Sequence, residues 1–186
     1  PGRLIDFYKQ RVFDLASGPL VMGVVNVTPD SFSDGGRYLD ANAAIAHARA
    51  MIDEGVNLVD VGGESTRPGA APVSEAEELA RILPVVTELR DFPVSVDTRH
   101  PNVMRAALAA GACMINDVEA LTAPGALEAV AASDCALCLM HKKGDPATMQ
   151  ESPTYTDVVA EVRDYLAARI AACEAAGIAR ERIAVD

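Results

Sequence analysis

Three polar side chains stand where an apolar run of the sequence ends. Asp97 follows V-S-V, Asn116 follows C-M-I, and Asp186 follows I-A-V. Two carboxylates and one amide suit the edge of a planar nitrogen heterocycle that carries an amino group beside a ring N–H. Each residue taken alone could instead cap the following helix, as Asp117 could also do. Three such residues on separate strands predict joint contact with one ligand.

Two loops rich in polar residues follow the first two apolar runs. The first reads T-P-D-S-F-S-D-G-G over residues 28–36, shortly after Asn26, and the second reads G-G-E-S-T-R-P-G-A over residues 62–70. Arg67 beside hydroxyls suits a phosphate or carboxylate oxygen. An aspartate-bearing loop near such an anion indicates Mg²⁺, which prefers carboxylate, amide and phosphate oxygens. The alternative is a pair of rigid turns, since Pro and Gly are ordinary turn residues.

The cysteines and histidines favour packing over chemistry. Cys135 and Cys138 lie in one continuous apolar run, and residues three apart in a strand point to opposite faces. We therefore expect buried thiols and no metal site here. The sequence contains no H-E-x-x-H and no triad-like pattern, so no catalytic histidine is expected, although His141 could line the site.

The elements that must position these residues are six short apolar runs separated by helical patterns, an alternation that predicts a parallel sheet. Pro84 is expected to kink or shorten the second helix. The helical patterns carry recognisable start and stop signals, namely Asp40 with Gly55, a capping box at Ser74, Pro101 with Gly111, a short pattern over 124–132, and a long one over 155–174 closed by Gly177.

Two α/β architectures use this alternation. An open doubly wound sheet fits 186 residues comfortably, whereas a (β/α)8 barrel typically needs about 250. An open sheet, however, places function at a few neighbouring strands, while a barrel gathers every strand's carboxyl end around one site. All six runs here end in polar or glycine-rich segments. We therefore predict the first six βα units of a (β/α)8 TIM barrel, forming a single C-terminally incomplete domain over residues 1–186 that stops at the tip of strand six.

The charge balance restricts the partners. With 27 acidic and 16 basic side chains the formal net charge is -11, which argues against general binding to nucleic acid or to anionic membranes. No apolar stretch approaches the roughly 18 residues of a membrane span, and no signal-peptide pattern begins the sequence. A cytoplasmic protein is expected.

Longer motifs give the chain a family resemblance. G-V-V-N-V-T-P-D-S-F-S-D-G-G (23–36) and V-G-G-E-S-T-R-P-G-A (61–70) resemble the two signature segments of the dihydropteroate synthase family. S-V-D-T (95–98), I-N-D (115–117) and C-L-M-H (138–141) agree in order and spacing. The resemblance covers essentially the whole chain. It implies a (β/α)8 barrel and a transferase of folate biosynthesis, a sulfonamide target, that joins p-aminobenzoate to (7,8-dihydropterin-6-yl)methyl diphosphate and releases pyrophosphate.

The resemblance also implies roles for residues at the strand ends. Asp97, Asn116 and Asp186 would hold the pterin, with Met140 packed near its ring. Asn26 would contact Mg²⁺ or the diphosphate. Diphosphate departure would leave a cationic methylene on an electron-rich pterin, so that a dissociative substitution is expected rather than general-base catalysis.

The two loops receive the remaining roles from the resemblance. Asp34 and Arg67 would be the catalytic residues, acting on the diphosphate, and Phe32 would belong to the same loop as Asp34. Thr66 and Pro68 would help Arg67 to form the p-aminobenzoate pocket. Both loops are expected to order over the diphosphate and exclude water from the cation.

Two other functions share these features. A pterin-binding methyltransferase barrel would use similar Asp and Asn residues but has no diphosphate to hold, so the two loops speak against it. A non-catalytic pterin-binding paralogue would have degenerate loops, and these are intact. The resemblance further implies a homodimer and later anion-site residues, a Lys and an Arg-x-His, that follow beyond Asp186, so that residues 1–186 alone are expected to be inactive.

Overall fold

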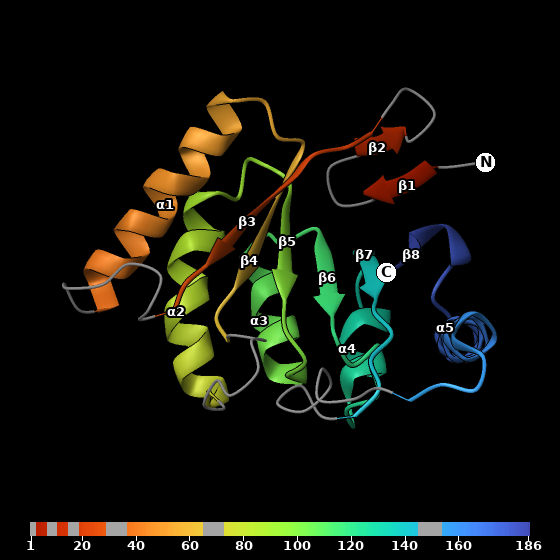
Figure 1. Ribbon diagram of the computed structural model, residues 1–186. Coiled ribbons are helices and arrows are strands. Elements are labelled where there is room, and N and C mark those ends of the chain that lie inside the picture. The colour runs from red at the N-terminus through yellow and green to blue at the C-terminus, as the bar shows by residue number, and fades with distance from the viewer. Residues whose placement is uncertain (1–2, 7–10, 15–18, 29–36, 65–72, 145–153) are drawn as a thin grey trace.

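The computed structural model describes residues 3–6, 11–14, 19–28, 37–64, 73–144 and 154–186 (Figure 1). Its largest sheet contains six parallel strands that pair in the order of the sequence, each with the next. These strands are β3 Met22–Asn26, β4 Leu58–Gly62, β5 Val94–Asp97, β6 Met114–Asp117, β7 Ala136–Leu139 and β8 Ile183–Val185. All six predicted apolar runs are therefore strands.

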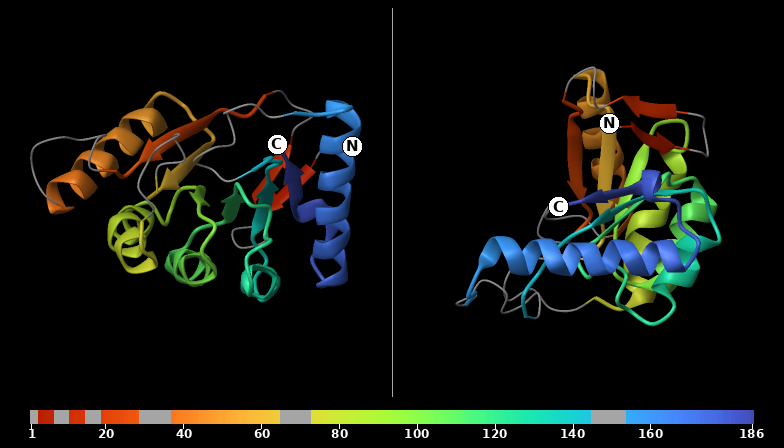
Figure 2. Two further views of the ribbon diagram at one scale, coloured as in Figure 1. Left: turned by 60° about the horizontal axis from the view of Figure 1, so that its bottom comes forward. Right: turned by 90° about the vertical axis from the view of Figure 1, so that its right-hand side faces the viewer.

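The strand order decides between the two predicted architectures. A doubly wound sheet reverses its strand order at a switch point, whereas a barrel adds each strand beside the last. The order β3-β4-β5-β6-β7-β8 contains no reversal, and Figure 2 shows the helices in an arc around the outer side of the curved sheet. The chain thus forms six units of a (β/α)8 barrel, and its sheet is not closed, as predicted.

The helices follow most of the predicted signals. Ser74 Oγ accepts from Glu77 N at 3.3 Å at the start of α2, and Gly111 adopts φ 112° after α3. Asp40 was wrong as the helix start, because α1 begins at Arg37, and Pro84 does not shorten α2, which continues to Glu88. The described helices are α1 Arg37–Asp53, α2 Glu75–Glu88, α3 Pro101–Ala110, α4 Ala126–Ala131, α5 Val158–Ala175 and the 3-10 helix η1 Arg180–Arg182.

An antiparallel hairpin near the amino end of the chain was not predicted. Its strands are β1 Arg3–Asp6 and β2 Arg11–Asp14, and β1 contacts β7 and η1. Figure 1 shows the hairpin near the end of the sheet where the strands begin. The hairpin thus lies on the opposite side from the polar strand ends.

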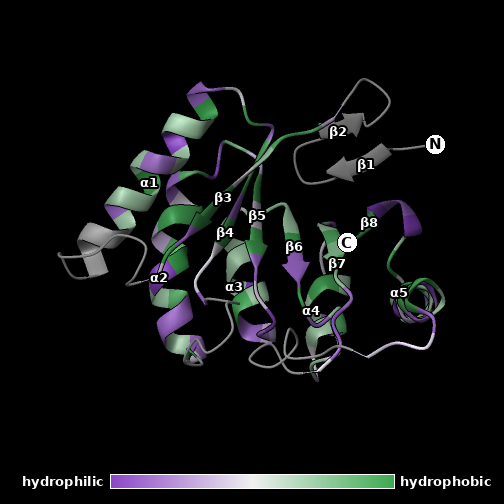
Figure 3. Cartoon of the chain, viewed as in Figure 1, coloured by the Kyte–Doolittle hydropathy of each residue, from purple (hydrophilic) through white to green (hydrophobic). Residues whose placement is uncertain are grey.

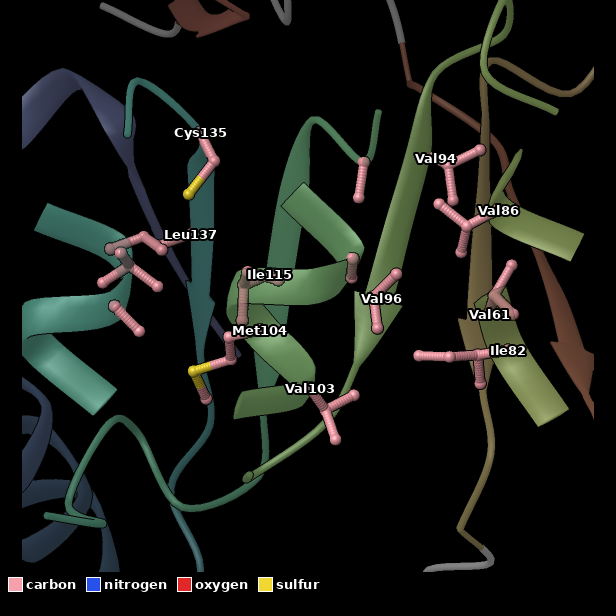
Figure 4. Packing of buried hydrophobic residues seen from close by; sticks show 14 of the residues in the cluster. Val61, Ile82, Val86, Val94, Val96, Val103, Met104, Ile115, Cys135 and Leu137 are labelled. Atoms are coloured by element: carbon pink, nitrogen blue, oxygen red, sulfur yellow. The ribbon is translucent and has the colours of Figure 1, made fainter. Parts of the chain in front are cut away.

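The two faces of the sheet have different surroundings. Outward side chains such as Val61, Val96 and Leu137 pack against the helices in the main core (Figure 4). Inward side chains form only a small apolar cluster around Leu58 and Met114. The helices therefore hold the sheet from outside, and the inner face remains available near its polar ends.

Three of the four cysteines are buried, as predicted, and Cys138 is less buried than expected. Cys113, Cys135 and Cys173 are buried, Cys138 is half-buried, and all four are free thiols. Cys135 belongs to the outer core, whereas Cys138 packs against the inner cluster. The two members of the C-A-L-C run therefore face opposite ways.

Gly63 sets the distance between the end of β4 and helix α2. A Cβ atom at this position would lie 2.8 Å from Ile82 Cγ2 and 2.9 Å from Glu78 Cγ, and both side chains are fully buried. Replacing Gly63 by Ala must therefore push α2 away from the sheet. We expect Gly63→Ala to lower the free energy of unfolding by about 1–3 kcal/mol, measured by urea denaturation of the full-length protein.

The adjacent glycine supplies the control. A Cβ on Gly62 would meet Asn26 Oδ1 at 3.4 Å and Asp97 Cβ at 3.7 Å, which are ordinary contacts. Gly62→Ala should change the unfolding free energy by less than about 0.5 kcal/mol. Equal losses in the two variants would contradict the close approach of α2 to Gly63.

Candidate active site

The sheet register places the predicted strand-end residues in one row. Across the sheet Asn26 pairs with Gly62, Gly62 with Asp97, and Asp97 with Asn116, which in turn pairs with Cys138. Residues in one register row of a parallel sheet point to the same face. Asn26, Asp97 and Asn116 therefore share the inner face at the carboxyl end of the strands, where β6 becomes hydrophilic in Figure 3.

Met140 and Asp186 extend the same face by two residues on neighbouring strands. The backbone of Asp186 is held beside β7, where its N–H donates to Leu139 O at 3.0 Å and its carbonyl accepts from His141 N at 3.3 Å. The Met140 N–H donates to Asp117 O at 3.3 Å. All five predicted site residues on the described part of the chain thus lie at one end of the sheet.

Asp97 is the most perturbed acid of this group. Burial, followed by the negative charges of Asp60, Asp117 and Glu78, raises its pKa from 3.8 to about 7. A carboxyl group in this state binds a proton near neutrality unless a ligand supplies N–H donors to its charged form. Such a shift at a strand end is typical of functional sites.

Asp60 is a site residue that the sequence did not single out. It lies in the middle of β4, is only 4% exposed, and its pKa is raised by burial despite hydrogen bonding. Asn116 Nδ2 donates to Asp60 Oδ2 at 3.3 Å. This bond uses one amide N–H and leaves the carbonyl oxygen and the second N–H of Asn116 for a ligand. The only sequence signal was a carboxylate inside the apolar run L-V-D-V.

Asp117 serves the loop after β6. Its carboxylate accepts from Glu119 N and Leu121 N, both at 2.8 Å. The capping alternative was wrong for this residue, because the following helix α4 begins at Ala126 with Gly125 as its N-cap. Burial raises its pKa to about 6, although those two bonds oppose the shift. Ala120 and Leu121 adopt φ of 50° and 59°, the left-handed region that L-residues seldom visit. Asp117 therefore fixes an unusual loop directly after Asn116.

The thiol of Cys138 is also tuned by this site. Burial raises its pKa to about 11, and the charges of Asp186, Asp60 and Asp97 act in the same direction. The thiol is therefore neutral at pH 7. The three acids come from β4, β5 and the end of β8, which lie on the same sheet.

The rings of two histidines contact residues outside the row of strand-end residues. His100 Nδ1 lies 2.6 Å from Glu78 Oε2, and His141 packs edge-on against Tyr165 at 5.1 Å between ring centroids. His47 is exposed on α1. The expectation of no catalytic histidine remains a prediction.

Five predicted loop residues lie outside the described residues, namely Phe32, Asp34, Thr66, Arg67 and Pro68. The residues that flank the two loops are described, and they begin at the same end of the sheet as Asn26 and Gly62.

Comparison with known proteins matches residues 22–186 to the family described as pterin binding enzyme. The chain is 53% identical over 173 residues to dihydropteroate synthase of Escherichia coli K12, covering 91% of this chain and 61% of that synthase. The chain therefore spans less than two thirds of the length of these relatives.

Solved structures agree with the sequence match. The structure of Xanthomonas albilineans dihydropteroate synthase with 4-aminobenzoic acid superposes with a TM-score of 0.89 at 51% identity, covering 99% of this chain and 65% of that one. The Burkholderia cenocepacia synthase complexed with 7,8-dihydropteroate superposes with a TM-score of 0.85 at 49% identity, covering 100% of this chain and 63% of that one. The Yersinia pestis synthase in a sulfonamide drug complex superposes with a TM-score of 0.87 at 47% identity, covering 95% of this chain and 65% of that one.

Among the described helices, none is long and apolar enough to cross a membrane. The family match, the strand order and the row of polar strand ends lead to one assignment. The chain belongs to the pterin-binding enzyme family.

Proposed function

We propose that the full-length protein is a dihydropteroate synthase. It joins p-aminobenzoate to (7,8-dihydropterin-6-yl)methyl diphosphate and yields 7,8-dihydropteroate and pyrophosphate. The observation that carries this proposal is the placement of Asp97 and Asn116 in one inward row, with Asp186 held at the same end of the sheet beside the end of β7. Relatives of this chain were solved with 4-aminobenzoic acid and with 7,8-dihydropteroate bound.

In this proposal the acid group binds the pterin edge. The pterin amino group and ring N–H donate to Asp97 and Asp186, and the free carbonyl and N–H of Asn116 complete the pattern. Met140 packs near the ring from β7. Asp60 acts through Asn116, because its hydrogen bond fixes the orientation of that amide.

The leaving diphosphate requires a different environment. Asn26 would offer one amide oxygen to Mg²⁺, and the diphosphate and water would supply the other ligands, since Mg²⁺ usually keeps several waters and needs few protein ligands. No three His, Cys, Asp or Glu side chains in the described part of the chain could hold an ion together. When bound, Mg²⁺ would neutralise charge that develops on the departing diphosphate. Arg67 and Asp34 would act at the same group from the two loops.

The substitution proceeds by breaking the bond between the methylene carbon and the diphosphate oxygen. The bond electrons leave with the diphosphate, and the pterin ring stabilises the cationic methylene. The arylamine nitrogen of p-aminobenzoate then forms the new bond to that carbon and loses a proton. Phe32, Thr66 and Pro68 would exclude water from the cation and form the pocket for the arylamine.

The deciding experiment measures pyrophosphate release by the full-length protein. Release should require both the pterin diphosphate and p-aminobenzoate, and Asp97→Asn and Arg67→Ala should each lower the rate by about 100-fold or more. Pterin binding without release would indicate a non-catalytic paralogue, and methyl transfer from methyltetrahydrofolate would indicate the other barrel function. Unchanged rates in both variants would refute the site assignment.

The pH dependence of pterin binding follows from Asp97. Because its pKa is near 7 in the free protein, the ligand-binding carboxylate form increases as the pH rises through that value. Pterin affinity should therefore rise about tenfold between pH 6 and pH 8, with proton release on binding near pH 6. Titration calorimetry in buffers of different ionisation enthalpy measures both effects. Asp97→Asn should bind weakly and lose the dependence, and a variant that retains it would contradict the assignment.

The same shift predicts the stability of the unliganded protein. A raised pKa means that the folded state binds the proton of Asp97 more tightly than the unfolded state does. The contribution of this group to the free energy of unfolding is therefore fully present below pH 3.8 and is lost as the pH rises through about 7. Asp97→Asn removes the buried charge. At pH 8 it should raise the free energy of unfolding by roughly 1–3 kcal/mol, with a gain that disappears toward pH 4. A constant gain across this pH range would exclude ionisation of Asp97 as the cause.

Gly62 should matter for binding although it tolerates a methyl group structurally. A Cβ there would lie between Asn26 and Asp97, on the ligand face of the sheet. We expect Gly62→Ala to weaken pterin binding by about tenfold, measured by calorimetry, while the unfolding midpoint remains unchanged. Wild-type affinity in this variant would place the ligand away from β4.

The homodimer is proposed on the family resemblance, and the location and partners on the charge balance and apolar patterns of the sequence. We propose a homodimer in the cytoplasm, with no nucleic acid or membrane as partner. Light scattering on the full-length protein tests the oligomeric state.

A further inference from the structure

A chain of charged side chains links the loops that follow four successive strands. Glu64 follows β4, Arg99 follows β5, Glu119 follows β6 and Lys142 follows β7. Arg99 contacts Glu64 through two nitrogens, at 3.0 and 3.1 Å, and Arg99 Nη1 lies 3.9 Å from Glu119 Oε1. Lys142 Nζ donates to Glu119 Oε1 at 2.9 Å. None of the roles assigned above involves these four residues.

Glu64 also closes the ends of the second loop. Its Oε1 accepts from the N–H of Val73 at 3.1 Å, and Glu64 and Val73 flank residues 65–72. One carboxylate therefore holds both ends of this segment while it receives two hydrogen bonds from Arg99. Burial raises the pKa of Glu64, but the bonds from Arg99 and Val73 outweigh it and keep the pKa below its usual value.

Neighbouring hydrogen bonds fix the position of Arg99 itself. Thr98 N donates to Asn116 O at 3.0 Å, and His100 N donates to Thr98 Oγ1 at 3.1 Å. The backbone around Arg99 is thus tied to β6, two residues from Asp97. The guanidinium is 30% exposed and the Glu64 carboxylate 17%, so water screens this pair less than a surface pair.

We propose that Arg99 is a positioning residue for p-aminobenzoate, and that it acts through Glu64 by fixing both ends of the loop that carries Thr66, Arg67 and Pro68. This inference rests on the proposed function. A planar, bidentate guanidinium sets direction as well as distance, which a lysine at the same place cannot do. Glu119 and Lys142 extend the link to the loops after β6 and β7. The positions of Asp97 and Asn116 do not depend on it, because the sheet register holds them. The charge of Glu64 raises the pKa of Asp97 less than burial and the charges of three other acids do.

The test substitutes Arg99 in the full-length protein and compares the two substrates. Arg99→Met should raise the KM for p-aminobenzoate about tenfold, while calorimetric affinity for pterin alone stays within about twofold. Arg99→Lys should give a smaller rise, because it keeps the charge but loses the second hydrogen bond. Arg49→Met is the matched control, since it removes an exposed ion pair to Glu88 between α1 and α2, away from the strand ends. It should change neither quantity.

A second measurement does not depend on catalysis. Amide hydrogen exchange in the peptide that contains Val73 should become at least about fivefold faster in Arg99→Met than in Arg49→Met. The reason is that Glu64, no longer held by Arg99, binds the Val73 N–H less firmly; we call this Arg99–Glu64–Val73 arrangement the clasp. If the proposed function is wrong, the wild-type protein releases no pyrophosphate, but the difference in exchange between the two variants is still present. The two failures can therefore be told apart.

Three results would overturn the inference. Unchanged exchange at Val73 would mean that Arg99 does not hold the clasp. Faster exchange with an unchanged KM for p-aminobenzoate would mean that the clasp does not position this substrate. An equal loss of pterin affinity in Arg99→Met would mean a general structural role.

Discussion

The hydrogen-bond register of the parallel sheet is the constraint on which the site depends. Each strand pairs with its sequence neighbour, so that Asn26, Gly62, Asp97, Asn116 and Cys138 are brought into one row. A slip of one residue in any strand would turn its polar end from the inner face into the outer core. The valines and leucines of that core resist such a slip, because they would become exposed on the inside. Packing of the helices therefore specifies the chemistry at the strand ends.

This arrangement makes it unfavourable for the acids near the strand ends to carry a negative charge. Asp60, Asp97 and Asp117 lie on three neighbouring strands, and burial raises the pKa of all three. Asp60 and Asp117 are partly compensated by hydrogen bonds from Asn116 and from backbone N–H groups. For Asp97 the pKa is raised by burial and then by the charges of nearby acids, so a ligand with N–H donors would favour its charged form. The site is thus prepared for a ligand whose edge donates hydrogen bonds.

Local patterns were sufficient to predict most of this fold. Apolar runs, Ser74 at a helix start and Gly111 at a helix end are signals that neighbouring residues determine, and each was found as expected. The strand-end residues Asp97 and Asn116 followed from the same patterns. The barrel was favoured over the open sheet because every strand ended in polar or glycine-rich residues, and the strand order agrees.

The missed features depend on contacts between distant residues. Asp60 meets Asn116 across 56 residues, and Arg99 meets Glu64 across 35, so neither pair has a local signature. The four-residue strands of the β1–β2 hairpin are too short for a clear alternation. Pro84 failed as a stop signal because Ile82, Val85 and Val86 are buried in the core and hold the helix together around it. Tertiary packing decided each of these cases.

The unreversed strand order also bears on how the chain can assemble during synthesis. From β3 to β8, each strand needs only the strand made just before it, so the sheet can grow one βα unit at a time as the chain emerges. The hairpin is the exception, because β1 contacts β7 and η1, which are translated more than a hundred residues later. The hairpin is therefore among the last of the described elements to reach its native contacts.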